Sequence, residues 1–373
     1  MILTKCAVCA TELGLSLGKK CGRCSTRYCG AECQVQHWKE GGHDTLCKPI
    51  KRAGGAEQYN ANKKYTEAVS VAAEACAEDT KGQTCFICTQ ALHWKTKEGL
   101  VRGCSCRGTA GFAHVSCLAE QAKILVAEAV ENNKDSQWHR WHTCSLCEQN
   151  YHSVVSCALG WACWKTYVGR PETDPFPSCA MNLLGLGLSG AGLEEDALSV
   201  READLAIKRR LGRDGDDIIA AQSNLAISYR RLGRLEEALR LREDVYAGNL
   251  KLYGEEGEDT ILEALNYSAL LLNLKRFQEA KSLLRKMIPV ARRVLGNNDQ
   301  SMLRMRNNYA GALYADPAST LDDLREAVTT LEDTERIARR VLGGAHPIAK
   351  ATYHILQEVR GGLRAREAPS TSA

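Results

Sequence analysis

The repeat that decides the fold reads NLAISYRRLGRLEEALRLREDVYAGNLKLYG over residues 224–254 and NYSALLLNLKRFQEAKSLLRKMIPVARRVLG over residues 266–296. Each copy has the pattern of a helix, a short turn and a second helix, and LGRLEEA at 232–238 marks the clearest turn. Helix pairs of this kind cannot bury their apolar faces alone. We therefore expect them to stack into an α-solenoid with an extended groove.

The period of the repeat is 42 residues. One asparagine recurs at this step, as Asn182, Asn224, Asn266 and Asn308, and glycines recur as Gly212, Gly254 and Gly296. The next glycine, Gly343, comes 47 residues later, so ADPAST at 315–320 reads as an insertion. We place the repeats at residues 180–362 and expect a disordered tail at 363–373.

The first 150 residues hold two ladders of Cys and His, each with the eight ligands of a two-zinc cross-braced module. The first ladder consists of Cys6-x2-Cys9, Cys21-x2-Cys24, Cys29-x3-Cys33 and His43-x3-Cys47. The second consists of Cys85-x2-Cys88, Cys104-x-Cys106, His114-x2-Cys117 and Cys144-x2-Cys147. Eight ligands for two metals leave no open coordination position, so we expect four structural Zn²⁺ ions and no catalytic one.

The segments around the ladders have helical composition. We expect helices over Tyr59–Ala77, Leu118–Val130 and Val154–Val168, and a break at the proline-rich PETDPFPS of residues 171–178. The predicted order is a zinc module at 1–50, a helical linker at 51–82, a second zinc module at 83–152 and a helix with a proline-rich linker at 153–179. The predicted fold class is mostly α, with two small zinc modules followed by the solenoid.

Composition limits the partners and the compartment. Of the 18 cysteines, 14 stand in the ladders, and reduced thiols on metal favour the cytosol or nucleus. The opening MILTKCAVC reaches a candidate ligand at once, so we expect no signal peptide. The uncharged run Val154–Trp164 is shorter than the roughly 20 residues of a membrane helix. Fourteen thiolates with four zinc ions would change the formal net charge of +4 to about −2, which argues against nucleic-acid binding.

The first ladder resembles the MYND zinc finger, whose aromatic–cysteine and CQ-x3-W elements stand here as Tyr28-Cys29 and Cys33-Gln34-Val35-Gln36-His37-Trp38. The resemblance implies a peptide-binding module. It also implies one zinc on Cys6, Cys9, Cys29 and Cys33, and another on Cys21, Cys24, His43 and Cys47. The chain departs from the family where Gly41-Gly42 lengthen the gap before the histidine. His37, one helical turn after Cys33, is therefore an alternative ligand to the favoured His43.

The second ladder resembles the RING-CH (RINGv) finger, whose CRG-x5-H segment corresponds to residues 106–114. The resemblance implies one zinc on Cys85, Cys88, His114 and Cys117, and another on Cys104, Cys106, Cys144 and Cys147. It also implies a platform for a ubiquitin-conjugating enzyme, to which Ile87, Phe86 and Trp138 or Trp141 would contribute. Alternatively, these aromatic residues only cover the zinc cluster. Glu148 stands where many active RING fingers carry a cation, which counts against ligase activity.

The repeats resemble the tetratricopeptide units of kinesin light chains, which share the 42-residue step and the loop LGGAHP, here at 342–347. In that family, asparagines of the first helices clamp the backbone of a bound peptide. The resemblance assigns this role to Asn182, Asn224, Asn266 and Asn308. A carboxamide both donates to and accepts from a peptide group. The alternative is that each asparagine caps or bridges neighbouring helices.

Two functions follow from these patterns. The first is a zinc-binding adaptor whose MYND finger and repeats bind proteins or peptides. The second is a RING-CH ubiquitin ligase whose repeats recruit substrates. A nucleic-acid binder is a weak third, because basic and aromatic residues do not interleave along one face. We identify no general acid, general base or nucleophile, so the sequence offers no catalytic residue.

Overall fold

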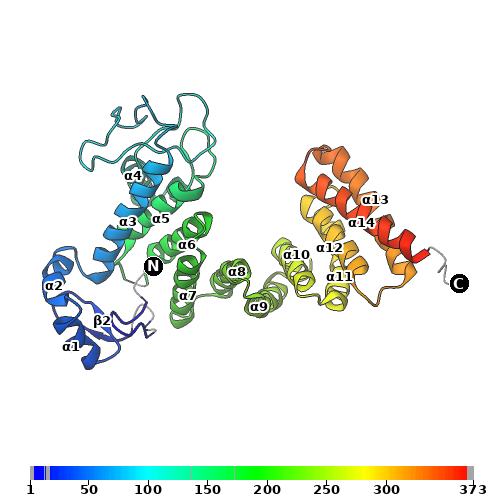
Figure 1. Cartoon of the computed structure of the whole chain (residues 1–373), viewed down its shortest axis with the longest axis horizontal. Coiled ribbons are helices and arrows are strands. Elements are labelled where there is room, and N and C mark those ends of the chain that lie inside the picture. Colours follow the sequence, from blue (N-terminus) through cyan, green and yellow to red (C-terminus); the bar gives the residue numbers. More distant parts are fainter. Residues whose placement is uncertain (1–3, 12, 14–16, 135, 172, 368–373) are drawn as a thin grey trace. The chain divides into compact units, whose positions relative to one another are not determined.

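The computed structural model describes residues 4–11, 13, 17–134, 136–171 and 173–367 of the 373-residue chain. The chain divides into two compact units, Met1–Arg213 and Asp214–Ala373. Figure 1 shows helices through most of the chain, with irregular loops near α4 and short strands near α1. The predicted fold class is confirmed: cysteine-rich modules precede stacked helix hairpins.

The N-terminal module is small and has a core of its own. Strands β1 (Lys19–Lys20) and β2 (Arg27–Tyr28) form an antiparallel pair, followed by helices α1 (Ala31–Lys39) and α2 (His43–Arg52). Its core contains the fully buried ring of Tyr28 and four of the ladder's residues, with Leu13, Ile50 and Ala56. Since so few apolar side chains are buried, this module depends on additional links for stability.

The predicted helices of the linker and second module are confirmed to within a few residues. They are α3 (Ala56–Ala75), α4 (Val115–Glu131) and α5 (Ser153–Tyr167), with a short 3-10 helix η1 (Trp138–Trp141) between the last two. Their apolar faces form one core together with cysteines of the second ladder, of which Cys85, Cys104, Cys117 and Cys144 are buried. The second module therefore shares its core with the helices around it, unlike the first module.

The proline-rich break is shorter than predicted. Asp174 caps helix α6 (Pro175–Gly190) by accepting a hydrogen bond from the Phe176 amide at 2.9 Å, and proline suits the first turn of a helix. Helix α7 (Glu194–Arg210) completes a hairpin with α6. An added Cβ at Gly187 would lie 2.7 Å from the Ser156 carbonyl oxygen, so glycine lets α6 pack closely on α5.

The division between the compact units lies inside the predicted repeat region. Helices α6 and α7 share the core of α3, α4 and α5, although the repeat period predicted a boundary at residue 180. The reason is that α6 buries apolar residues on nearly all sides, including Met181, Leu184 and Leu188. The first helix pair therefore belongs to the same compact unit as the zinc modules.

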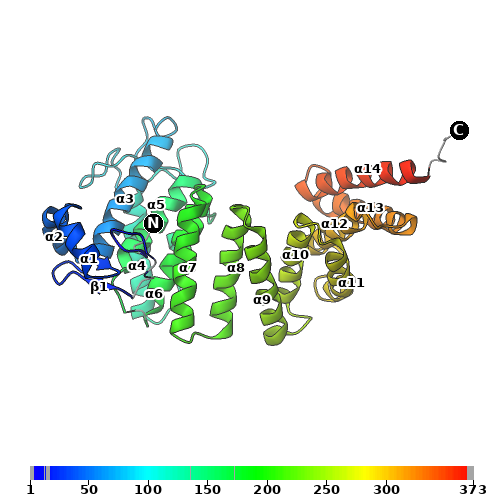
Figure 2. The same cartoon turned by 60° about the horizontal axis from the view of Figure 1, so that its bottom comes forward.

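The second unit consists of helix hairpins throughout its described residues. Its helices are α8 (Gly215–Arg231), α9 (Leu235–Tyr253), α10 (Glu258–Asn273), α11 (Phe277–Val294), α12 (Gln300–Ala315), α13 (Leu321–Leu342) and α14 (Pro347–Glu367). Successive helices pack antiparallel, and first helices also contact each other, as in α10 with α12 and α12 with α14 (Figures 1 and 2). This arrangement is the predicted solenoid of helix pairs.

The predicted insertion at 315–320 is well connected to its neighbours. The Asp316 carboxylate accepts bonds from Lys281 at 2.6 Å, Gln278 at 2.6 Å and the Ala318 amide at 2.9 Å. Thr320 then begins α13 with a capping box. The extra residues thus form a fixed connection between α12 and α13.

The predicted disordered tail at 363–373 is wrong for residues 363–367, which are helical. Helix α14 continues through Glu367, whose carboxylate accepts a bond from Arg325 at 2.9 Å. An ion pair to the neighbouring helix explains the extra helical residues, since sequence composition alone does not reveal such a contact. Residues 368–373 lie outside the described residues. Within the described part of the chain, no helix is both long and apolar enough to cross a membrane.

One turn of the solenoid contains a strained residue. Gly233 between α8 and α9 has φ of 75°, and the equivalent Lys275 between α10 and α11 has φ of 59°. A side chain in this left-handed region is unfavourable. Lys275→Gly is therefore expected to stabilise the second unit by about 1 kcal/mol in denaturant unfolding. Gly233→Lys is the matched control and should destabilise it by a similar amount; a neutral Lys275→Gly would contradict the strain.

Candidate metal centres and groove residues

The structure brings the sixteen predicted ligands into four groups of four, and within each group all ligand atoms lie within 4.8 Å of one another. The groups are Cys6, Cys9, Cys29 and Cys33; Cys21, Cys24, His43 and Cys47; Cys85, Cys88, His114 and Cys117; and Cys104, Cys106, Cys144 and Cys147. In both ladders the first and third pairs meet, and so do the second and fourth. This alternation is the cross-brace that the two resemblances imply.

The geometry of each group fits a tetrahedral thiolate-binding metal. Sulfur–sulfur distances are 3.4 Å for Cys9–Cys29, 3.9 Å for Cys21–Cys47 and 3.8 Å for Cys106–Cys144. A tetrahedron with zinc–sulfur bonds of about 2.3 Å has edges of about 3.8 Å, whereas a disulfide would need about 2 Å. The donors are thiols and imidazoles without carboxylates, which favours Zn²⁺ over Mg²⁺ or Ca²⁺.

Two glycines decide which histidine joins the second group. His43 Nε2 lies 3.4 Å from Cys24 Sγ and 3.5 Å from Cys21 Sγ. Gly42 has φ of 70° and, with Gly41, turns the chain between α1 and α2, so that His43 and Cys47 lie one turn apart on α2. His37 instead pairs through Nδ1 with the Tyr28 hydroxyl at 2.9 Å. The structure thus places the favoured histidine in the group and the alternative outside it.

Crowded sulfurs in the first group show why a cation suits it. The Thr11 hydroxyl lowers the pKa of Cys9 to about 6, whereas interaction with the Cys29 sulfur raises the pKa of Cys33 to about 12. Without a positive charge, one thiolate therefore keeps a neighbouring thiol protonated. A divalent cation would let all four sulfurs ionise together.

The first group of the second ladder has a supported histidine. His114 Nδ1 lies 3.3 Å from Cys88 Sγ and 3.6 Å from Cys117 Sγ, at the start of α4. Its other nitrogen, Nε2, lies 3.4 Å from the Ala91 carbonyl oxygen. A backbone acceptor at Nε2 fixes the tautomer that leaves Nδ1 free to bind metal. Burial also lowers the pKa of His114, which favours the neutral ligand form.

The last group depends on a glycine that sequence reasoning missed. Gly111 has φ of 84°, and an added Cβ would lie 2.6 Å from Cys106 Cβ and 3.2 Å from Cys104 Sγ. The backbone of the CRG-x5-H loop therefore closes over the sulfurs only with glycine at this position. The signal for it was present, because Gly111 stands within the segment that carries the resemblance.

The remaining histidines and cysteines lie outside the four groups. Among the described residues, no candidate metal group includes His93, His139, His142 or His152. Cys157 and Cys163 are buried in the helical core, and burial raises the pKa of Cys157 to about 11. A protonated, buried thiol is unreactive, so these two residues have a structural role.

The aromatic residues of the predicted platform are mostly covered. Trp141 is fully buried, Phe86 packs against the core, and Trp138 contacts the rings of Tyr167 and Phe176. The expectation that Trp141 contributes to a surface is therefore wrong, because it fills the space between η1 and α5. Figure 1 shows the loops of the second zinc module beside α4 and α5.

Two aliphatic residues of the zinc knuckles remain on the surface. Ile87, named in the prediction, is 37% exposed, and Leu146, which sequence reasoning missed, is 51% exposed. Leu146 stands between the two cysteines of the last knuckle, as Ile87 does in the first knuckle. Glu148, which follows the last ligand, pairs with Arg140 at 3.0 Å.

The four repeated asparagines lie on the first helices of successive hairpins, α6, α8, α10 and α12. Asn182 and Asn266 are exposed, and Asn224 and Asn308 are half-buried. Asn308 donates through Nδ2 to Ser268 Oγ at 3.1 Å and so bridges α12 to α10. The bridging alternative thus describes Asn308, whereas Asn266 is exposed and its side chain hydrogen-bonds Glu263 on the same helix.

Comparisons with known proteins identify two of the three resemblances. The MYND finger family matches residues 6–47, and the tetratricopeptide repeat family matches residues 218–259 and 264–301. Neither match includes residues 83–152, so the RING-CH resemblance stays a prediction based on ligand order. The chain thus contains a MYND finger and tetratricopeptide repeats.

The chain is also similar to longer and shorter proteins. A clustered mitochondria protein homolog from Debaryomyces hansenii is 28% identical over 161 residues, which are 42% of this chain and 12% of that protein. A kinesin-light-chain candidate from Podosopora anserina with nearly identical TPR-like repeats is 24% identical, covering 52% of this chain and 96% of that one, with a TM-score of 0.42. BtubC from P. vanneervenii is 15% identical, covering 69% of this chain and 96% of that one, with a TM-score of 0.38.

Proposed function

We propose that this protein is a zinc-binding adaptor for protein–protein interactions, in which the MYND finger and the helical repeats bind peptide partners. The observation that carries the proposal is the closure of all sixteen candidate ligands into four complete groups. A metal with four protein ligands has no position for water or substrate, so it holds a surface in place and performs no chemistry. Each group would hold one Zn²⁺, two per module.

Exposed apolar side chains on the MYND finger support a peptide-binding role. Val35 and Trp38 on α1 are 51% and 45% exposed, and Leu46 on α2 is 38% exposed. Monomeric proteins seldom leave neighbouring large apolar side chains in water without a binding role. Trp is also among the residues that contribute most to protein interfaces.

The repeats would bind an extended peptide through their asparagines. Asn266, an exposed residue, and Asn224, a half-buried one, stand one repeat apart on α10 and α8. An amide that donates to and accepts from a peptide group recognises the backbone independently of side chains. This property suits an adaptor that accepts several partners.

The groove prediction is tested with the double variant Asn224→Ala/Asn266→Ala in the full-length protein. A peptide selected on the wild type from a random display library should lose about tenfold or more in affinity, because two amide contacts are removed. Thermal stability should stay close to that of the wild type.

Asn308→Ala is the control for a bridging role. It should lower stability by about 1 kcal/mol through loss of its bond to Ser268. If the double variant loses comparable stability and keeps its peptide affinity, the asparagines bridge helices and the groove proposal is wrong.

A ubiquitin ligase is the second candidate, favoured by the exposed Ile87 and Leu146 in the first and last knuckles of the second module. Such a ligase would position a ubiquitin-conjugating enzyme without any catalytic residue of its own. Autoubiquitination with a panel of conjugating enzymes should then be lost in Ile87→Ala and Cys88→Ser. Val130→Ala, an exposed apolar residue on α4, should retain it. No activity across the panel with zinc bound would exclude the ligase and leave the adaptor.

A further inference from the structure

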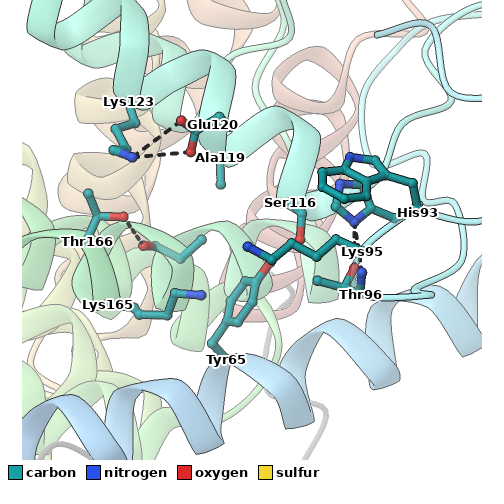
Figure 3. A pocket seen from close by; sticks show the side chains of 12 residues that line it. Tyr65, His93, Lys95, Thr96, Ser116, Ala119, Glu120, Lys123, Lys165 and Thr166 are labelled. Carbon is teal, nitrogen blue, oxygen red and sulfur yellow. Dashed lines mark hydrogen bonds and ion pairs between the residues drawn. The ribbon is translucent and has the colours of Figure 1, made fainter. Parts of the chain in front are cut away.

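A pocket of about 640 Å³ opens between helices α3, α4, α5 and the loop 93–96, and its lining includes neither MYND-finger residues nor the repeated asparagines. Figure 3 shows its residues: Tyr65 comes from α3, Ser116 and Lys123 from α4, and Lys165 from α5. We call it the lysine pocket, defined by Tyr65, Trp94, Lys95, Lys123 and Lys165. Its volume lies within the range of about 300–1,000 Å³ typical of ligand sites.

The polar groups in the wall of the lysine pocket are already bonded to each other. The Glu98 carboxylate accepts from the Ser116 amide at 2.7 Å, from the Ser116 hydroxyl at 2.8 Å and from the Thr96 hydroxyl at 3.1 Å. Because the Ser116 proton goes to Glu98, the Tyr65 hydroxyl donates to Ser116 at 2.9 Å. These bonds hold three elements together, and they leave the wall with no free acceptor at this point.

The cations of the pocket are only partly neutralised. Lys123 pairs with Glu120 at 3.3 Å, but among the described residues no carboxylate lies within ion-pair distance of Lys95 or Lys165. The Lys165 ammonium lies 3.8 Å from the centre of the Tyr65 ring. Burial lowers the pKa of Lys165, and the negative charge of Glu98, which forms no ion pair with it, opposes this shift only in part. An incoming anion would restore the missing partner.

We propose that the lysine pocket binds an acidic segment of a partner protein through Asp or Glu carboxylates. Lys165 and Lys95 would bond the carboxylates, and Trp94, which is 68% exposed at the rim, would cover an apolar residue beside them. A phosphate group suits the site less. Anions favour the amides at helix N-termini, and the Ser116 amide at the start of α4 is already taken by Glu98.

This inference rests on the proposed adaptor function, because it makes the ligand a protein. The two can fail separately. The asparagine variants should leave the lysine pocket unchanged, and the lysine variants should leave capture of the display-selected peptide unchanged.

The test uses the full-length, zinc-loaded protein and a labelled, end-blocked peptide rich in Glu with interspersed Leu. Fluorescence anisotropy should detect binding that weakens with salt. Lys165→Gln and Lys95→Gln should each reduce the affinity about tenfold, and Trp94→Ala should also reduce it. Lys81→Gln is the matched control, since Lys81 is 71% exposed, pairs with Glu78 and lies outside the pocket. It should bind like the wild type.

Several results would overturn the proposal. One is equal binding of the analogue with Gln in place of Glu. Another is unchanged affinity in Lys95→Gln and Trp94→Ala, which change exposed side chains and should fold even if Lys165→Gln does not. Absence of binding to the Glu-rich peptide at low salt also contradicts it. Preference for a phosphotyrosine peptide over the Glu-rich one would show that the ligand class is wrong.

Discussion

Removal of zinc from the full-length protein is expected to unfold residues 6–52 and 85–147 and to weaken the helices that pack on the second module. Metal binding contributes about 10–16 kcal/mol to the folding of small zinc modules. The first module has little other core, since its buried cluster consists of four ladder cysteines and a few apolar side chains. Hydrogen exchange after chelation should therefore become fast throughout residues 6–52.

The second module should respond differently, because its cysteines belong to a larger core. Cys144 is fully buried in the cluster that includes α3, α4 and α5. Cys144→Ser should therefore reduce exchange protection in these helices as well as in the finger. Cys24→Ser should affect the first module alone. In each variant the zinc content should fall from four ions per chain to about two, because the cross-brace couples the sites of one module.

Cys179→Ser is the matched control for these substitutions, since Cys179 is exposed and lies outside the four groups. It should retain four zinc ions and wild-type protection. Hydrogen exchange of residues 6–52 and 85–147 that does not change on complete zinc removal would contradict the structural role of the metals.

Loss of one partner of a buried ion pair is expected to give the second large effect. Arg242 on α9 donates to Glu263 on α10 at 2.7 Å, and their side chains are only 6% and 4% exposed. Arg242 also donates to Ser223 on α8 at 3.0 Å, so it connects three helices. Arg242→Met leaves a buried carboxylate without its cation, and it should destabilise the second unit by about 3–5 kcal/mol.

The double variant Arg242→Met/Glu263→Leu tests whether the stability is lost because a buried charge is left unpaired or because the side chain at position 242 has changed. It removes both charges, so it should recover most of the lost stability. The single variant should also be less destabilised in acid than at neutral pH. Burial already raises the pKa of Glu263 to about 7, and without Arg242 the protonated form is favoured further. Denaturant unfolding followed by exchange in α9 and α10 measures each case. A double variant as unstable as Arg242→Met would contradict this account.

Much of the metal site could be predicted because zinc ligands follow short, local spacing rules. The pairing of first with third and second with fourth pairs came from the resemblances, and the structure has the same pairing. The identity of the histidine was not settled by spacing, since both His37 and His43 lie one turn from a cysteine. The turn at Gly41-Gly42 decides it, by rotating α2 so that His43 faces Cys21 and Cys24.

The surfaces were predicted less well than the metal sites. Trp141 was predicted as a platform residue but lies in the core. An aromatic side chain near a small zinc site can bury its ring against a partner protein or against neighbouring helices, and the sequence does not distinguish the two. The division at residue 213 was also missed. A repeat period gives the spacing of helices along the chain. Which core a helix joins depends on the helices that pack against its other face, and for α6 and α7 these belong to the core of α3, α4 and α5.

The sequence by itself determined the helix repeat, the two ladders and the order of ligands, since these depend on periodicity and on residues close together in the chain. The tertiary structure alone decided which aromatic residues are covered, that Asn308 bridges two helices, and that Lys95, Lys123 and Lys165 meet around Tyr65. These features join segments far apart in the sequence. No local pattern specifies such meetings, because they arise only when the apolar faces of α3, α4 and α5 pack into one core.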